Sequence, residues 1–164
     1  MAKIVLSAAI VVFTSFCGYL FTKRYRRKKL FFSQWNDFND YFLNEIVYYR
    51  RPLGEFIRTH TFSGGFAHLI DAYLLRLKQG DSTLGVAFAV PELDYLNKEE
   101  KTAIDDYFQM LGKGDSSSQK VYFSSIKEQI LTQRKAAEEA CKRYGDLYIK
   151  LGFLCGLFIV ILIV

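Results

Sequence analysis

Long uncharged apolar stretches occupy both ends of the chain. The 18 residues from Ile4 to Phe21 carry no charge, and as a helix they cover about 27 Å, close to the ~30 Å core of a bilayer. The 14 residues from Leu151 to Val164 cover only about 21 Å, although residues 147–149 extend them and Lys150 can snorkel to the interface. The pattern predicts a transmembrane helix at each end, over 1–22 and 151–164. A buried core helix is the alternative for the second.

Between these stretches, apolar residues recur every three or four positions, and sustained strand alternation is not visible. The breaks at Pro52, Ser63-Gly64-Gly65, Gly80, Pro91 and Gly112-Lys113-Gly114 divide the segment. The predicted helices are 30–49, 53–60, 66–77, 82–90, 97–111 and a long one from 115 to 144. We therefore predict an all-α fold, a cytoplasmic bundle of about five or six helices over 23–150, flanked by the two transmembrane helices.

Two local signals support this division. Asn97 and Glu100 have the spacing of a capping box at the start of a helix. The last helix either runs straight into the second apolar stretch, with Gly145 as a soft joint, or breaks before it, and the pattern leaves both readings open.

A dense basic run follows the first apolar stretch. It consists of Lys23, Arg24, Arg26, Arg27, Lys28 and Lys29. Because positive charge beside a membrane helix stays in the cytoplasm, the run predicts that both termini lie outside and that 23–150 is cytoplasmic. A cleaved signal peptide would carry its basic residues before the apolar run and small residues after it, and only Lys3 precedes this one.

The distribution of charge argues against a nucleic-acid partner. The formal net charge is +5, but residues 30–150 contain 15 Lys and Arg against 17 Asp and Glu. The basic character is therefore concentrated in the run 23–29, which suits a topology signal and anionic lipid head groups.

Residues for catalysis are not clustered. His60 and His68 are separated by a glycine break, a P-loop is missing, and Cys17, Cys141 and Cys155 form no C-x-x-C motif. We predict no enzyme activity, no cofactor, no metal and no small-molecule substrate. The 15 Phe and 11 Tyr fit either an aromatic core or, in part, a partner-binding surface.

Several motifs occur in a recognisable order. Glu45-Ile46-Val47-Tyr48 precedes Pro52-Leu53-Gly54-Glu55, then come Leu111-Gly112-Lys113-Gly114-Asp115 with Gln119, and finally Leu151-Gly152 with Gly156-Leu157. Together they resemble the stage III sporulation protein AB family, in length and order along the whole chain.

The resemblance implies a role in endospore formation. Members of that family sit in the mother-cell membrane, in a channel-like complex that joins mother cell and forespore. Their cytoplasmic domain is similar to the platform proteins of type II secretion and type IV pilus machines. The implied partners are a secretion-type cytoplasmic ATPase, the other membrane subunits of the channel and the lipid bilayer.

Two sets of residues follow as candidates. Glu45, Tyr48, Pro52, Leu53 and Glu55 form a candidate partner-binding patch, although Pro52 and Glu55 also make a good helix start. Gly112, Gly114 and Asp115 fit a glycine turn followed by an N-cap. Two other roles stay open, a platform subunit of another secretion or pilus system and a membrane-tethered helical scaffold.

Overall fold

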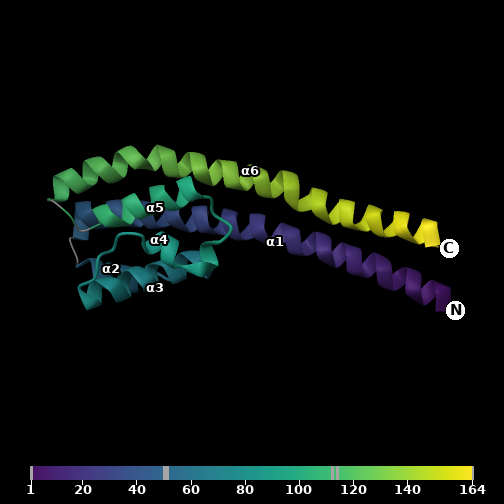
Figure 1. Cartoon of the computed structure of the whole chain (residues 1–164). Helices are drawn as coiled ribbons and strands as arrows, with labels where there is room; N and C mark the ends of the chain where they lie inside the picture. Colours follow the sequence, from purple (N-terminus) through teal and green to yellow (C-terminus); the bar gives the residue numbers. More distant parts are fainter. Residues whose placement is uncertain (1, 50–51, 112, 114, 164) are drawn as a thin grey trace. The chain divides into compact units, whose positions relative to one another are not determined.

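The structure is a computed structural model, and it describes residues 2–49, 52–111, 113 and 115–163. The described elements are helical throughout. In chain order they are α1 (Ala2–Asn44), the π-helical turn η1 (Glu45–Tyr49), α2 (Leu53–Arg58), α3 (Gly64–Gln79), α4 (Val86–Ala89), the 3₁₀ turn η2 (Pro91–Leu93), α5 (Lys98–Met110) and α6 (Ser116–Ile163), as Figure 1 shows.

The chain divides into two compact units. Unit 1 comprises residues 1–29 and 135–164, and unit 2 comprises residues 30–134. Each long helix contributes to both units, because α1 runs from Ala2 to Asn44 and α6 from Ser116 to Ile163. The N-terminal stretch and the predicted helix 30–49 therefore belong to one helix, as do the predicted last helix and the C-terminal stretch.

The all-helical fold is confirmed, and most predicted helices are present with shifted ends. The capping box of α5 is also confirmed. The Asn97 side chain accepts a hydrogen bond from the Glu100 N–H at 2.8 Å, and the Glu100 carboxylate accepts one from the Asn97 N–H at 2.9 Å. The helix that was predicted to reach Tyr49 ends as an α-helix at Asn44 and continues as η1.

The predicted helix over 82–90 is wrong except at Val86–Ala89. Gly85 has a φ of 73°, in the left-handed region that glycine adopts readily. The buried Asp105 carboxylate accepts hydrogen bonds from the Gly85 N–H at 2.6 Å and the Ala87 N–H at 3.3 Å. A carboxylate from α5 therefore fixes the beginning of α4, which a periodicity argument does not foresee.

Unit 2 is built around an aromatic core. Phe38 of α1 is fully buried, and its ring contacts rings of α1 itself, α2, α3, α5 and the loop before α3. These partners are Phe42 at 6.2 Å, Phe56 at 5.5 Å, Phe62 at 5.7 Å, Phe66 at 5.7 Å, Tyr107 at 6.2 Å and Phe108 at 6.1 Å between centroids. Most of these pairs are tilted or edge-to-face, the geometry that aromatic quadrupoles favour.

One buried amide connects three helices of this unit. Asn39 of α1 is 1% exposed. Its oxygen accepts a hydrogen bond from the Tyr107 hydroxyl of α5 at 3.1 Å, and its amide nitrogen donates to the Phe123 carbonyl of α6 at 3.3 Å. A buried amide with both ends bonded fixes the register of the helices that it joins.

The buried tyrosines predict a loss of stability at high pH. Burial raises the pKa of Tyr73 to about 12 and holds the pKa of Tyr107 well above its usual range. Because folding favours the neutral phenol, this stabilisation is complete below about pH 10 and is lost as the pH rises toward 12. The free energy of unfolding is expected to fall by up to about 1.4 kcal/mol per pH unit for each such tyrosine.

Urea unfolding in detergent, followed by the fluorescence of the single Trp35, tests this at about pH 8 and about pH 11. The fall in the free energy of unfolding between these two pH values should be smaller in Tyr73→Phe than in the unsubstituted chain. Tyr48→Phe, at a 75% exposed position, is the control and should show the full fall. Equal falls in both variants would contradict the assignment to Tyr73.

Candidate functional site

The two helix segments of unit 1 approach each other closely at glycines. A Cβ atom at Gly152 of α6 would lie 2.6 Å from the Thr14 carbonyl oxygen of α1, and one at Gly156 would lie 2.9 Å from the Val11 Cα. A Cβ atom at Gly18 of α1 would collide with the Tyr148 carbonyl oxygen of α6. Side chains of any size are therefore excluded here, and we call Gly18, Gly152 and Gly156 the glycine seam.

Threonine hydroxyls along the same seam have polar partners in the helices. The Thr22 hydroxyl is fully buried and lies 3.1 Å from the Gly18 carbonyl and 3.0 Å from the Gly145 carbonyl. The Thr14 hydroxyl lies 3.0 Å from the Ile10 carbonyl. Small residues and internally bonded hydroxyls are the features by which helices associate inside a bilayer.

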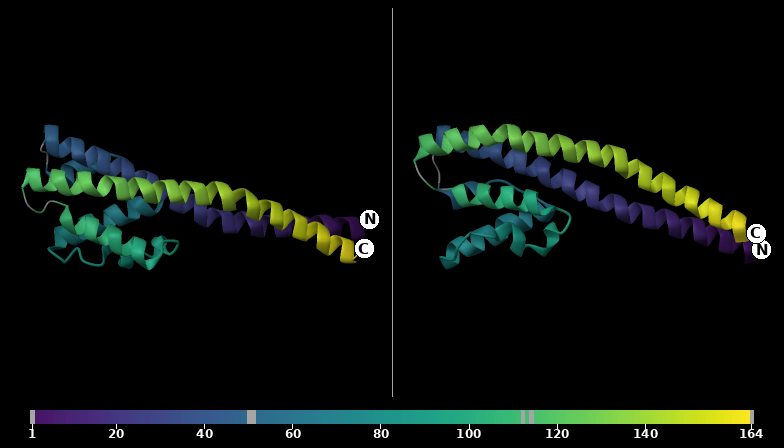
Figure 2. Two further views of the ribbon diagram at one scale, coloured as in Figure 1. Left: turned by 90° about the horizontal axis from the view of Figure 1, so that it is seen from above. Right: turned by 45° about the horizontal axis from the view of Figure 1, so that its top comes forward.

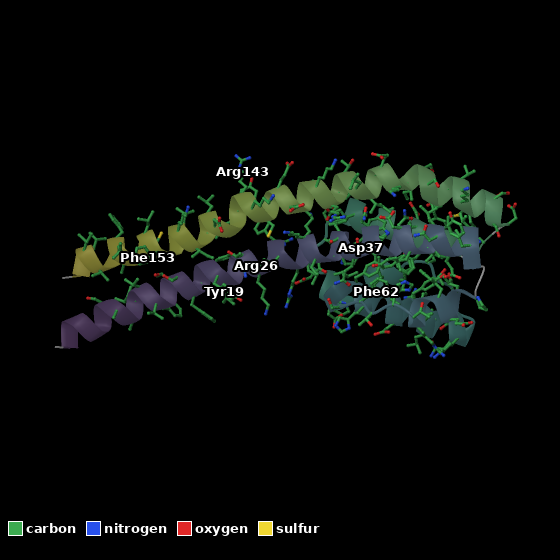
Figure 3. All side chains as sticks on the ribbon, turned by 180° about the vertical axis from the view of Figure 1, so that it is seen from behind. Tyr19, Arg26, Asp37, Phe62, Arg143 and Phe153 are labelled. Carbon is green, nitrogen blue, oxygen red and sulfur yellow. The ribbon has the colours of Figure 1, made fainter. Side chains whose placement is uncertain are left out.

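The outside of this helix pair is apolar. The exposed large apolar side chains described for the unit 1 part of α1 are Val12, Phe13, Phe16, Tyr19, Leu20 and Phe21, and those of α6 include Leu147, Leu151, Phe153, Leu154, Phe158, Ile161 and Leu162. Phe153, which is labelled on α6 in Figure 3, is 48% exposed. The pair thus buries small residues and exposes large apolar ones, the reverse of a soluble helix pair.

One helix of the described chain, over Ser116–Leu162, is long and apolar enough to cross a membrane. The described part of the N-terminal stretch is not long and apolar enough by itself to count as such a helix. The predicted span begins at Ile4, and the side chains of residues 4–6 lie outside the described set. The N-terminal span therefore stays a prediction.

Tyrosines and cations lie next to the apolar surface, at the end of unit 1 nearer to residue 29 of α1. Tyr25 of α1 stacks on Tyr144 and Tyr148 of α6, with centroids 5.3 and 5.9 Å apart. The guanidinium of Arg26 lies 5.8 Å from the Tyr19 ring, and that of Arg143 lies 5.6 Å from the Tyr144 ring. Tyrosine is enriched where a membrane helix meets water. These tyrosines and cations therefore mark a candidate level for the membrane–water interface.

The predicted partner-binding patch lies on η1 and α2 of unit 2. Tyr48 is 75% exposed, Pro52 and Glu55 are exposed and Leu53 is half-buried, but Glu45 is only 4% exposed. Four of the five residues are thus accessible, and Glu45 belongs to the interior. The patch spans a π-helical turn, a rare conformation that is frequent at functional sites.

Of the second predicted set, Asp115 caps a helix. Asp115 directly precedes α6, and its carboxylate accepts hydrogen bonds from the Ser118 N–H at 3.3 Å and from the Ser117 hydroxyl. The bonds from Ser117 and then Ser118 lower the pKa of Asp115 to about 2. Gly112 and Gly114 lie outside the described residues. In Figures 1 and 2, η1 and the beginning of α6 lie at the same end of unit 2.

Of the two histidines, His60 packs against aromatic rings and His68 is exposed. The His60 ring stacks on Tyr41 at 4.4 Å, and its Nδ1 lies 3.2 Å from the Phe56 carbonyl. Within the described ranges, three or more His, Cys, Asp or Glu side chains never converge as a metal site would require.

The glycine seam was not singled out from the sequence, although a signal for it exists. Gly152 and Gly156 form a G-x-x-x-G motif inside the C-terminal apolar stretch, and Thr14, Gly18 and Thr22 repeat a small residue every four positions. Both patterns are typical of close helix packing in membranes.

In its described residues the protein is all-helical, one apolar helix could span a membrane, and residues 30–134 form an aromatic unit. The family model of stage III sporulation protein AB matches residues 3–164. The chain belongs to that family, and the family implies a role in sporulation. No curated protein and no solved structure matches the chain.

Proposed function

We propose that this protein is a non-enzymatic platform in the mother-cell membrane of a sporulating bacterium, within a channel complex that resembles a secretion system. Residues 1–22 and 151–164 would span the membrane, both termini would lie outside, and the helical body would be cytoplasmic. Its partners would be a secretion-type ATPase and the other membrane subunits of the channel.

The observation that carries the proposal is the construction of unit 1. A glycine seam inside and large apolar side chains outside suit a helix pair surrounded by lipid. The N-terminal segment packs against α6, which among the described helices is long and apolar enough to cross a membrane, and this packing supports a second span there. The basic run at 23–29 supports the orientation.

The accessible part of the patch on η1 and α2 supports a docking role for unit 2. An exposed tyrosine such as Tyr48 combines a large apolar ring with a hydrogen-bonding hydroxyl, and such residues are enriched among interface hot spots. Glu55 lies exposed in the first turn of α2. Its charge is therefore available to a basic partner surface.

Replacing Tyr48 with alanine should weaken capture of the ATPase by the full chain by about 2 kcal/mol or more, roughly thirtyfold, because a hot-spot ring is removed. Glu55→Arg should also weaken capture, through charge reversal. Both variants are measured by co-purification of the ATPase with the tagged full chain from sporulating cells.

Two matched controls separate docking from folding. Leu84→Ala removes a comparably exposed (64%) apolar side chain elsewhere on unit 2. Glu99→Arg reverses the charge in the first turn of α5, as Glu55→Arg does in α2. If the controls weaken capture as much as the patch variants, the docking role of this patch is wrong.

Deleting the gene and counting heat-resistant spores tests the wider role. The proposal expects engulfment to finish and the forespores to fail afterwards. If the count collapses but the ATPase is never captured, the membrane-tethered scaffold replaces the platform.

A further inference from the structure

We propose that unit 1 selects anionic phospholipids, and that it binds their head groups with Lys23, Arg24, Arg26 and Arg27 of α1 and Arg143 of α6. We call these five residues the cation collar. The proposal rests on the membrane insertion of unit 1 under the proposed function, and it adds a ligand class and a site to it.

The cation collar faces away from the helix contact. Successive residues of a helix are separated by about 100°. Gly18, Thr22 and Tyr25 of α1 face α6, as their contacts with Tyr148, Gly145 and Tyr144 show. The four collar cations of α1 therefore lie on the other faces of that helix. All five collar residues, including Arg143 of α6, are exposed. In Figure 3, Arg26 and Arg143 lie on opposite sides of the helix pair.

The described carboxylates leave the collar unpaired. Glu138 is the acceptor for Lys29 at 3.7 Å and for Lys142 at 3.6 Å. Among the described residues, the five collar cations form no ion pair. The collar is thus a dense positive surface whose anions must come from outside the chain.

The surroundings of the collar favour a lipid over a free anion. Phe21 is 65% exposed and lies two residues before Lys23, and Leu147 is 44% exposed and lies one helical turn after Arg143. The rings of Tyr19 and Tyr144 lie beside the guanidiniums of Arg26 and Arg143. A ligand that fits both parts carries a phosphate for the cations and acyl chains for the apolar surface, as an anionic phospholipid does.

Analysis of the lipid that the protein retains tests the selection of anionic phospholipids. The purified full chain is reconstituted into bilayers of phosphatidylcholine with about one fifth phosphatidylglycerol and is then extracted in mild detergent. We expect phosphatidylglycerol to be enriched several-fold over the bulk ratio, since each cation at the surface contributes roughly fivefold in affinity. The variant K23Q/R24Q/R26Q/R27Q should retain lipid at the bulk ratio.

The control K78Q/K98Q/K113Q/K120Q removes the same charge from exposed positions of unit 2, and it should keep the enrichment. Raising the salt from about 0.1 M to about 1 M should reduce enrichment in the unsubstituted chain, because screening shortens the reach of the charges. Inorganic phosphate and a short oligonucleotide, added as competitors, identify the source of the anion.

Enrichment that is lost in the collar variant alone supports the proposal. Equal loss in the unit 2 control, or displacement of the lipid by phosphate or oligonucleotide at low concentration, overturns it. A chain that stays in the bilayer and retains both lipids in the bulk ratio overturns this inference but not the proposed function. A chain that washes off the bilayer overturns the membrane insertion itself.

Discussion

Replacing Gly152 with leucine is expected to separate the two helix segments of unit 1. The Cβ atom of any residue at this position would lie 2.6 Å from the Thr14 carbonyl oxygen, which is backbone and has no flexible end to move. One helix must therefore shift, and the lost packing along the seam should cost about 1–3 kcal/mol or more. Membrane helices rely on this packing, because lipid supplies little hydrophobic drive for their association.

Thermal unfolding of the full chain in detergent measures this effect. A thiol-reactive dye reports on Cys17, which is half-buried and directly precedes Gly18 in α1. The midpoint should fall in Gly152→Leu and, to a smaller extent, in Gly152→Ala. Leu154→Ala changes an outward-facing residue that is 58% exposed and should leave the midpoint nearly unchanged. Indistinguishable midpoints for Gly152→Leu and the unsubstituted chain would show that the seam does not hold the pair together.

Replacing Phe38 with alanine is expected to destabilise unit 2 by about 3–5 kcal/mol. The ring is fully buried and contacts six other aromatic rings, so its removal leaves a cavity that the surrounding helices cannot close. This cost is a large share of the stability of an ordinary domain. Unit 2 should therefore be largely unfolded in mild urea.

The fluorescence of Trp35 provides the measurement, since this single tryptophan is buried against Tyr107 in the same core. Phe88→Ala is the matched control, because Phe88 is 48% exposed and its loss opens no interior cavity. The urea midpoint should fall sharply for Phe38→Ala and little for Phe88→Ala. Similar midpoints for the two variants would refute the central role of Phe38.

The sequence was sufficient where a local signal determines the structure. The beginning of α5 depends on two side chains three residues apart, and both appear in the sequence as a capping box. The breaks around α3 follow from glycines that end or begin helices. The order of the elements and the all-helical class follow from such signals.

The sequence was insufficient where a distant residue decides. A helix was predicted over 82–90 because this segment is short and apolar, but Asp105 fixes the beginning of α4 only at Val86. Glu45 looks like a surface residue, yet it is buried in unit 2. Burial of a charged residue depends on which elements cover it, and a periodic pattern carries no such information. The glycine seam is a different case, because its spacing was visible in the sequence.

The π-helical turn η1 has a consequence for insertions and deletions in this region. In a π-helix each carbonyl bonds an N–H five residues on, so the turn holds one residue more than an α-helical turn would. Removing a single residue from Glu45–Tyr49 would let ordinary α-helix continue from α1. Later side chains would keep nearly their present direction, because the π-helical turn takes up the one extra residue. If the same five residues adopted ordinary α-helix with none removed, every later side chain would instead rotate by about 100° around the axis. The π-helical form of this turn, as much as residue identity, sets the direction in which Tyr48 leaves the surface.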